Sequence, residues 1–130
     1  MEKKNRCLLV FHGSRSPGAL SHARFLQKQI CLHSPDLTIE IAFLQFSSPS
    51  LQDTLTDLAN QGVEKIYVLP MLLLPGTHAE NDIPAILESF RSMNPHPAVE
   101  LFPIIGKANT LPSFIGEACH LEIERSRNRI

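Results

Sequence analysis

Short apolar runs and helical stripes of apolar residues alternate along the chain. Residues 6–11 form a compact apolar run, and residues 37–44 are rich in β-branched and aromatic side chains, as strands are. Residues 64–74 form a third apolar run and residues 98–103 a fourth. Apolar residues recur at helical spacing in the segments 19–33, 49–61, 83–90 and 110–124. The pattern therefore predicts four consecutive strand–helix units.

This alternation predicts an α/β fold with a four-stranded parallel sheet. Crossovers between parallel strands are nearly always right-handed, so helices should flank both faces of the sheet. The run at 64–74 suits a strand that is covered on both faces. With 130 residues, the chain is most simply one domain, 1–130. In such sheets ligands bind at the carboxyl ends of the strands, which directs attention to residues 12–17, 45–48 and 75–82.

Local signals predict where the helices begin. Ser48 has the character of an N-cap, with Pro49 at the first helical position. Asn81 or Asp82 is the expected cap of the helix that carries Ile83.

Two histidines follow predicted strands directly. His12 comes after the first strand and His78 after the third, and these strands are commonly neighbours in such a series. We therefore expect the two imidazoles to approach one another. Neutral imidazole suits Fe(II), Co(II), Ni(II) and Zn(II), and two histidines leave coordination positions open for a substrate. The alternative for each histidine is a hydrogen bond to nearby backbone.

Several polar and flexible residues lie in the same loops. Glu80 is a candidate proton acceptor or partner of His78, and the alternative is a solvated loop carboxylate or a residue of the first helical turn. Candidate donors to an anionic ligand, and positions that let a flat ligand approach the backbone, are Ser14, Arg15, Ser47, Gly76 and Thr77.

Composition and charge exclude some classes of function. The formal charge of -1 provides no electrostatic footprint for nucleic acid. The first apolar run is too short for a signal peptide or a membrane span. The 3 cysteines contain no CxxC pair, so we expect free thiols, two of them buried, in a reducing cytosol.

Two quoted stretches carry a family resemblance. LLVFHGSRSP and IEIAFLQFSSPS through LLLPGTHAENDIP resemble the small, single-domain CbiX-type sirohydrochlorin chelatases of the chelatase superfamily. The resemblance implies half of the chelatase fold, a flavodoxin-like three-layer arrangement, used as a homodimer. It implies insertion of cobalt, iron or nickel into sirohydrochlorin, in cobalamin or siroheme biosynthesis. It places the metal ligands on His12 and His78, with the metal as substrate and no permanently bound cofactor.

One position departs from the family pattern. Many relatives carry glutamate where this chain has Gln45, beside the expected substrate. Glutamine cannot accept a proton, so either Glu80 or a histidine is the base, or the metal preference or activity differs. The alternative function is a non-catalytic tetrapyrrole or metal carrier. A histidine phosphatase is disfavoured, because Phe11 stands where that class needs an arginine.

Overall fold

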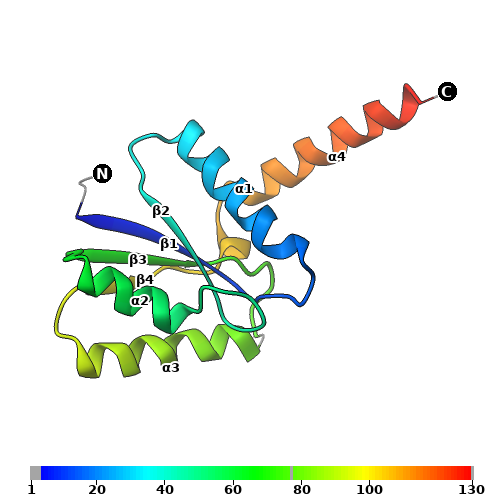
Figure 1. Cartoon of the computed structure of the whole chain (residues 1–130). Helices are drawn as coiled ribbons and strands as arrows, with labels where there is room; N and C mark the ends of the chain where they lie inside the picture. Colours follow the sequence, from blue (N-terminus) through cyan, green and yellow to red (C-terminus); the bar gives the residue numbers. More distant parts are fainter. Residues whose placement is uncertain (1–3, 77, 130) are drawn as a thin grey trace.

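A computed structural model describes residues 4–76 and 78–129 as a three-layer α/β fold (Figure 1). The sheet has four parallel strands in the order β2-β1-β3-β4, which confirms the predicted class and the pairing of the first strand with the third. The elements are β1 (Asn5–Phe11), α1 (Gly18–His33), β2 (Ile39–Phe43), α2 (Leu51–Asn60), β3 (Lys65–Pro70), α3 (His78–Met93), β4 (Ala98–Leu101), the 3₁₀ turn η1 (Ile105–Lys107) and α4 (Leu111–Arg127).

The alternation of side chains along β1 divides the core between the two faces of the sheet. Leu8 and Val10 point to the face covered by α2 and α3, where the buried cluster also includes Leu55, Ile66 and Leu87. Cys7, Leu9 and Phe11 point to the opposite face, where α1 packs through Leu20, Ala23 and Ile30. Both faces of the central strand are therefore apolar, which explains its continuous apolar run.

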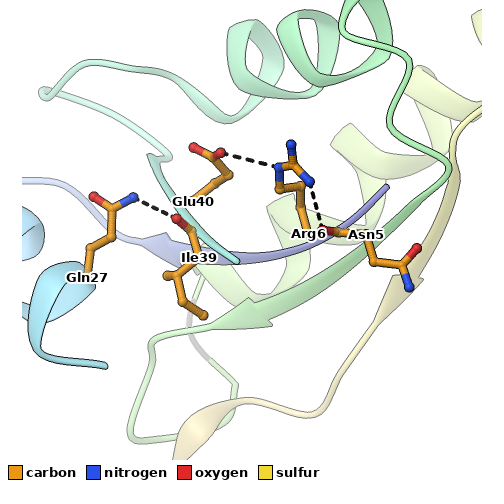
Figure 2. Close-up of polar contacts among 5 residues, drawn as sticks. All are labelled: Asn5, Arg6, Gln27, Ile39 and Glu40. Atoms are coloured by element: carbon orange, nitrogen blue, oxygen red, sulfur yellow. Dashed lines mark hydrogen bonds and ion pairs between the residues drawn. The ribbon is translucent and has the colours of Figure 1, made fainter. Parts of the chain in front are cut away.

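Polar contacts fasten the β2 side of the sheet (Figure 2). Arg6 on β1 lies beside Glu40 on β2, with its Nε 3.6 Å from Oε1, and its Nη1 donates to the Asn5 carbonyl at 2.9 Å. Gln27 of α1 donates to the Ile39 carbonyl at 2.6 Å. The second contact ties α1 to the edge strand, where one side lacks a neighbouring strand.

The last helix projects away from the body of the domain (Figure 1). None of the 17 residues of α4 is buried. Its exposed side chains include Phe114, Ile115, Leu121 and Ile123. The other three helices pack on the sheet, so α4 is an exception to the predicted covering of the faces.

The second helix begins two residues later than predicted. Its N-cap is Ser50, whose hydroxyl accepts the Asp53 N–H at 3.1 Å. The expected cap at Ser48 is wrong because the chain at 49–50 still runs beside β2. Phe43 donates its N–H to the Pro49 carbonyl at 2.9 Å and forms an isolated bridge with Ser50.

The third strand is shorter than its apolar run. It ends at Pro70, and the Leu73 and Leu74 side chains are 64% and 71% exposed. The neighbouring β1 ends at Phe11, so residues 72–74 have no strand there with which to pair. The prediction of a buried strand through Leu74 is therefore wrong, and an apolar loop projects at this edge.

Two further expectations concern cysteines and membranes. Cys7 and Cys31 are partly buried, Cys119 is exposed, and all three are free. Burial raises the pKa of the Cys7 thiol, and the nearby Asp36 carboxylate raises it further. Within residues 4–76 and 78–129, no helix is long and apolar enough to cross a bilayer.

Candidate functional site

The loops that follow β1 and β2 are bonded into one rim at the carboxyl edge of the sheet. The backbone N–H of Gln45 donates to the backbone carbonyl of His12 at 3.1 Å. The Ser47 hydroxyl donates to the Ser14 carbonyl at 2.9 Å and accepts the Ser14 N–H at 3.3 Å. Ser14 and Ser47, both predicted as substrate contacts, therefore hold this rim in shape.

A glycine makes the close approach of the two loops possible. Gly13 has a φ of 102°, and a Cβ there would lie 1.7 Å from the Gln45 carbonyl oxygen. An L side chain rarely adopts this backbone conformation, and no side chain fits this space. Gly13 therefore brings His12 and Gln45 together.

The Gln45 amide lies beside the His12 ring. Gln45 Nε2 lies 3.1 Å from His12 Nε2 and 3.5 Å from Nδ1. The other close polar atom is the Gly13 carbonyl oxygen, 3.3 Å from Nδ1. The imidazole is exposed to solvent, so a metal can reach it, but a metal at Nε2 must displace this amide.

His78 occupies the first position of α3, and its side chain is 90% exposed. Its Nδ1 lies 3.5 Å from the Asp82 carboxylate one turn later. A carboxylate at one ring nitrogen orients the imidazole and leaves the other nitrogen for a metal. The prediction of Asn81 or Asp82 as the cap is wrong, because the helix begins before both residues. The two histidines follow neighbouring strands, and each has its own polar partner.

Glu80 lies in the first turn of α3 and is engaged on two sides. Its carboxylate accepts the Gly76 N–H, which closes the turn that leads into the helix. Its Oε1 lies 4.0 Å from Lys107 Nζ. Gly76 has a φ of 77°, as its place in a tight turn requires. Thr77, predicted to contact substrate, lies outside the described residues.

Exposed apolar side chains in the loops after β2 and β3 were not predicted from the sequence. Phe46 is 56% exposed and adopts a φ of 65°, a left-handed conformation that is rare for a bulky residue and concentrates at functional sites. The Arg15 guanidinium carbon lies 4.5 Å from the centre of the Phe46 ring. The exposed Leu73 and Leu74 belong to the loop after β3 at the same edge. The sequence did contain a signal for the exposed leucines. The apolar run at 64–74 is longer than the run at 6–11 that forms the neighbouring strand.

The loop after β3, which carries Leu72 and Leu73, contacts η1. Gly106 donates its N–H to the Leu72 carbonyl at 3.0 Å. A Cβ at Gly106 would lie 1.7 Å from the Leu73 carbonyl oxygen, so only glycine permits this approach. The next residue, Lys107, adds a cation close to Glu80.

His22 of α1 is a further residue of this region. It is exposed, and it also lines a cavity of about 280 Å³ with Phe11, His12 and Ser14. Its ring stacks on Phe25 with centroids 5.8 Å apart. Among the described residues, no group of three or more His, Cys, Asp or Glu side chains is arranged to hold a metal ion.

The family model CbiX matches residues 6–125. The chain belongs to the CbiX family. A CbiX protein from Marinobacter aquaeolei VT8, described as a putative cobalamin (vitamin B12) biosynthesis protein, has a similar structure. The TM-score is 0.79 at 27% identity, over 93% of this chain and 98% of that one.

Two other similar proteins have names that state an activity or a bound metal. The sirohydrochlorin cobaltochelatase of Saccharolobus solfataricus is 38% identical over 84 residues, and the match covers 62% of this CbiX chain and 61% of the relative. The sirohydrochlorin chelatase SirB of Bacillus subtilis subspecies spizizenii, solved in complex with cobalt, has a TM-score of 0.68 at 30% identity. The match covers 78% of this chain and 43% of SirB, so the chain corresponds to about half of that longer protein.

Proposed function

We propose that this CbiX chain inserts a divalent metal, cobalt, iron or nickel, into sirohydrochlorin. The observation that supports the proposal most strongly is the location of two exposed imidazoles, His12 and His78, after neighbouring strands of a CbiX domain. Imidazole binds these metals, and two ligands leave positions open for the macrocycle. Relatives named sirohydrochlorin cobaltochelatase support the same reaction.

The metal is a substrate of the proposed reaction, and no permanently bound cofactor is required. His12 and His78 hold the partly dehydrated ion beside the ring. The ring nitrogens then replace the imidazoles, and two pyrrole protons leave as the dication enters. Glu80 or an unprotonated histidine accepts one of these protons, and solvent water accepts the other. Glu80 is the less free of these candidates, because its carboxylate is engaged by Gly76 and Lys107.

The rim has complementary features for a flat, polycarboxylate ring. Phe46, Leu73 and Leu74 offer an apolar surface, while Arg15 and Lys107 offer cations for carboxylate arms. A chain of 130 residues leaves this surface open on one side, so we propose a homodimer in which a second copy covers the ring. The cytosol remains the expected compartment.

The test of this function is a metallation assay. The protein is mixed with sirohydrochlorin and Co(II), Fe(II) or Ni(II), and the visible absorption bands are followed. We expect metallation well above the spontaneous rate with at least one metal, and the comparison ranks the three. Rates equal to the protein-free reaction for all three metals would exclude the enzyme and favour the carrier.

The carrier alternative rests on Gln45. Its amide lies against the His12 ring, where a glutamine cannot accept a proton from the substrate. We predict that Gln45→Glu increases the metallation rate about tenfold, since a carboxylate attracts the cation and accepts a proton where an amide does neither. Initial rates at saturating sirohydrochlorin provide the measurement. Gln52→Glu, an exposed glutamine of α2, is the matched control and should leave the rate unchanged. A slower Gln45→Glu enzyme would show that the amide itself is needed.

Arg15 tests the recognition of carboxylate arms. We predict that Arg15→Ala raises the KM for sirohydrochlorin about tenfold with little change in kcat. Losing a hydrogen bond to a charged group costs about 1.5–3 kcal/mol, reduced here because Arg15 is exposed. Arg24→Ala, at an exposed arginine of α1 outside the loops of the rim, should leave the KM unchanged. A fall in kcat with an unchanged KM would contradict the binding role.

A further inference from the structure

The backbone at Phe46 forms a strained turn. Its φ is 65°, and the Ser47 N–H donates to the Gln45 carbonyl at 2.8 Å across it. A hydrogen bond between residues two apart, with a positive φ at the residue between them, is the rare and strained form of the γ-turn. Glycine or asparagine adopts a positive φ at lower cost than a bulky side chain does. Phenylalanine at this position therefore works against folding stability.

Hydrogen bonds to the loop after β1 hold this turn on both sides. Before the turn, the backbone N–H of Gln45 donates to the His12 carbonyl at 3.1 Å. After it, the Ser47 hydroxyl donates to the Ser14 carbonyl at 2.9 Å and accepts the Ser14 N–H at 3.3 Å. Backbone strain persists only where surrounding contacts enforce it, and such positions cluster where ligands bind. The backbone that carries the Phe46 ring is therefore fixed before a ligand arrives.

The Phe46 side chain is largely exposed and lies against a cation. The residue is 56% exposed, and the Arg15 guanidinium carbon lies 4.5 Å from the centre of the ring, within the range of a cation–π contact. Single exposed apolar side chains are ordinary on protein surfaces. Exposure on a strained backbone is not, because a ring in water recovers little of the cost of the strain.

Two pairs of side chains follow one another across the rim. Gln45 Nε2 lies 3.1 Å from His12 Nε2, and the next residue of the same loop, Phe46, lies against Arg15. Each pair takes one residue from the loop after β1 and one from the loop after β2. The aromatic–cation pair is therefore adjacent to the pair that contains the proposed metal ligand.

We propose that Phe46 and Arg15 together bind one pyrrole of the substrate. The pyrrole packs on the part of the Phe46 ring that Arg15 leaves exposed, and the guanidinium pairs with a carboxylate arm of the same macrocycle. A flat π system that carries an anionic group is the chemistry that this pair complements. This role rests on the proposed function, and it assigns the residues that set the position of the macrocycle relative to His12.

The strained turn has a purpose in this arrangement. A side chain that is already held in its binding position loses less entropy when the ligand arrives. The cost of holding Phe46 is met when the chain folds, and the macrocycle then binds to a preformed pair. Phe46 should therefore affect affinity for the macrocycle more than it affects the rate of metal transfer.

Binding of metal-free sirohydrochlorin tests the role of Phe46. Phe46→Leu keeps an apolar side chain but removes the aromatic face, and we expect the Kd to rise about fivefold. An aromatic pair contributes the equivalent of about a two- to twelvefold change in binding beyond the buried area. Phe46→Tyr keeps the face and should bind as the wild type does. Titrations followed by the absorption and fluorescence of sirohydrochlorin provide the Kd.

Phe25→Leu is the matched control. Phe25 is 54% exposed and lies on α1, outside the loops of the rim, so its replacement should leave the Kd unchanged. The kcat of Phe46→Leu for metallation should stay within about twofold of the wild type. A wild-type Kd in Phe46→Leu, or an equal loss of affinity in Phe25→Leu, would overturn the assignment.

Glycine at position 46 separates a binding role from a structural one. Glycine adopts a positive φ without strain, so Phe46→Gly should melt at or above the wild-type midpoint while its Kd for sirohydrochlorin rises about tenfold. Circular dichroism melting and the same titration provide the two values. A lower midpoint combined with wild-type affinity would show that the ring only supports the fold, and the proposal would be wrong.

A double variant tests whether the two side chains act together. Independent residues change the Kd by the product of their single effects. Because Phe46 holds the guanidinium in place, Arg15→Ala combined with Phe46→Leu should raise the Kd by clearly less than that product. A change equal to the product would overturn the joint role.

The same titrations keep this assignment distinct from the proposed enzyme activity. A wild type that binds sirohydrochlorin with the expected dependence on Phe46, but metallates it no faster than the spontaneous rate, would remove the enzyme and support the aromatic–cation pair. A wild type that does not bind sirohydrochlorin would overturn both.

Discussion

Replacing His78 by alanine is expected to lower the metallation rate at least about 100-fold while leaving the fold intact. Changing only the hydrogen-bond partner of a metal ligand typically costs about 10–100-fold, and this change removes the proposed ligand itself. The His78 side chain is 90% exposed, so its loss creates no cavity. Initial rates of absorbance change, together with the thermal midpoint, measure the two halves of the prediction.

His33→Ala is the matched control for this experiment. His33 is an exposed histidine at the last position of α1, outside the loops at the carboxyl edge of the sheet. Its removal should change neither rate nor stability. Wild-type turnover in His78→Ala would remove His78 from the ligand set and leave His12 as the imidazole to test next.

Gly13→Ala is expected to destabilise the fold by about 2–4 kcal/mol, combining the cost of a positive φ with that of an overpacked contact. The new methyl group would lie 1.7 Å from the Gln45 carbonyl oxygen, so the two loops must separate. Against a typical total of about 5–15 kcal/mol, this is a large loss. Urea unfolding measures it as a lower midpoint, and metallation should fall as well, because His12 and Gln45 move apart.

Gly116→Ala is the appropriate comparison. Gly116 lies inside α4, and a Cβ there would meet nothing within 4 Å. Alanine is the better helix former by about 1 kcal/mol, so this variant should be at least as stable as the wild type. If Gly13→Ala unfolds at the wild-type urea concentration, the close contact between the loops does not exist in solution.

Hydrophobic periodicity predicted the fold because the burial of side chains in each strand and helix sets the spacing of apolar residues along the chain. The run at 64–74 indicated a covered strand, and Ile66 and Val68 are fully buried. The errors fall where tertiary contacts override local signals. Ser48 resembles a cap, but pairing of residues 49–50 beside β2 moves the cap to Ser50. Leu73 and Leu74 resemble core residues, but they lie beyond the end of the neighbouring strand.

For the site, the sequence predicted the two histidines as candidates because the ends of strands are recognisable without coordinates, and the structure places both after neighbouring strands. The sequence identified neither the contact of Gln45 with His12 nor the place of Phe46 beside Arg15. Both depend on the approach of two loops 33 residues apart, which only the packed structure defines. Lys107 was missed for the same reason, because its partner Glu80 belongs to a different strand–helix unit.

The order of strands in the sheet affects how this protein must be synthesised. β1 is made first, but it occupies the middle of the sheet, and Asn5 pairs with Lys65. At about 5–20 residues per second, the ribosome takes about 3–12 s to add the 60 residues that separate these partners. During that interval one edge of a highly apolar strand has no β3 with which to pair. Nascent chains that stop before β3 should therefore depend on chaperones to remain soluble.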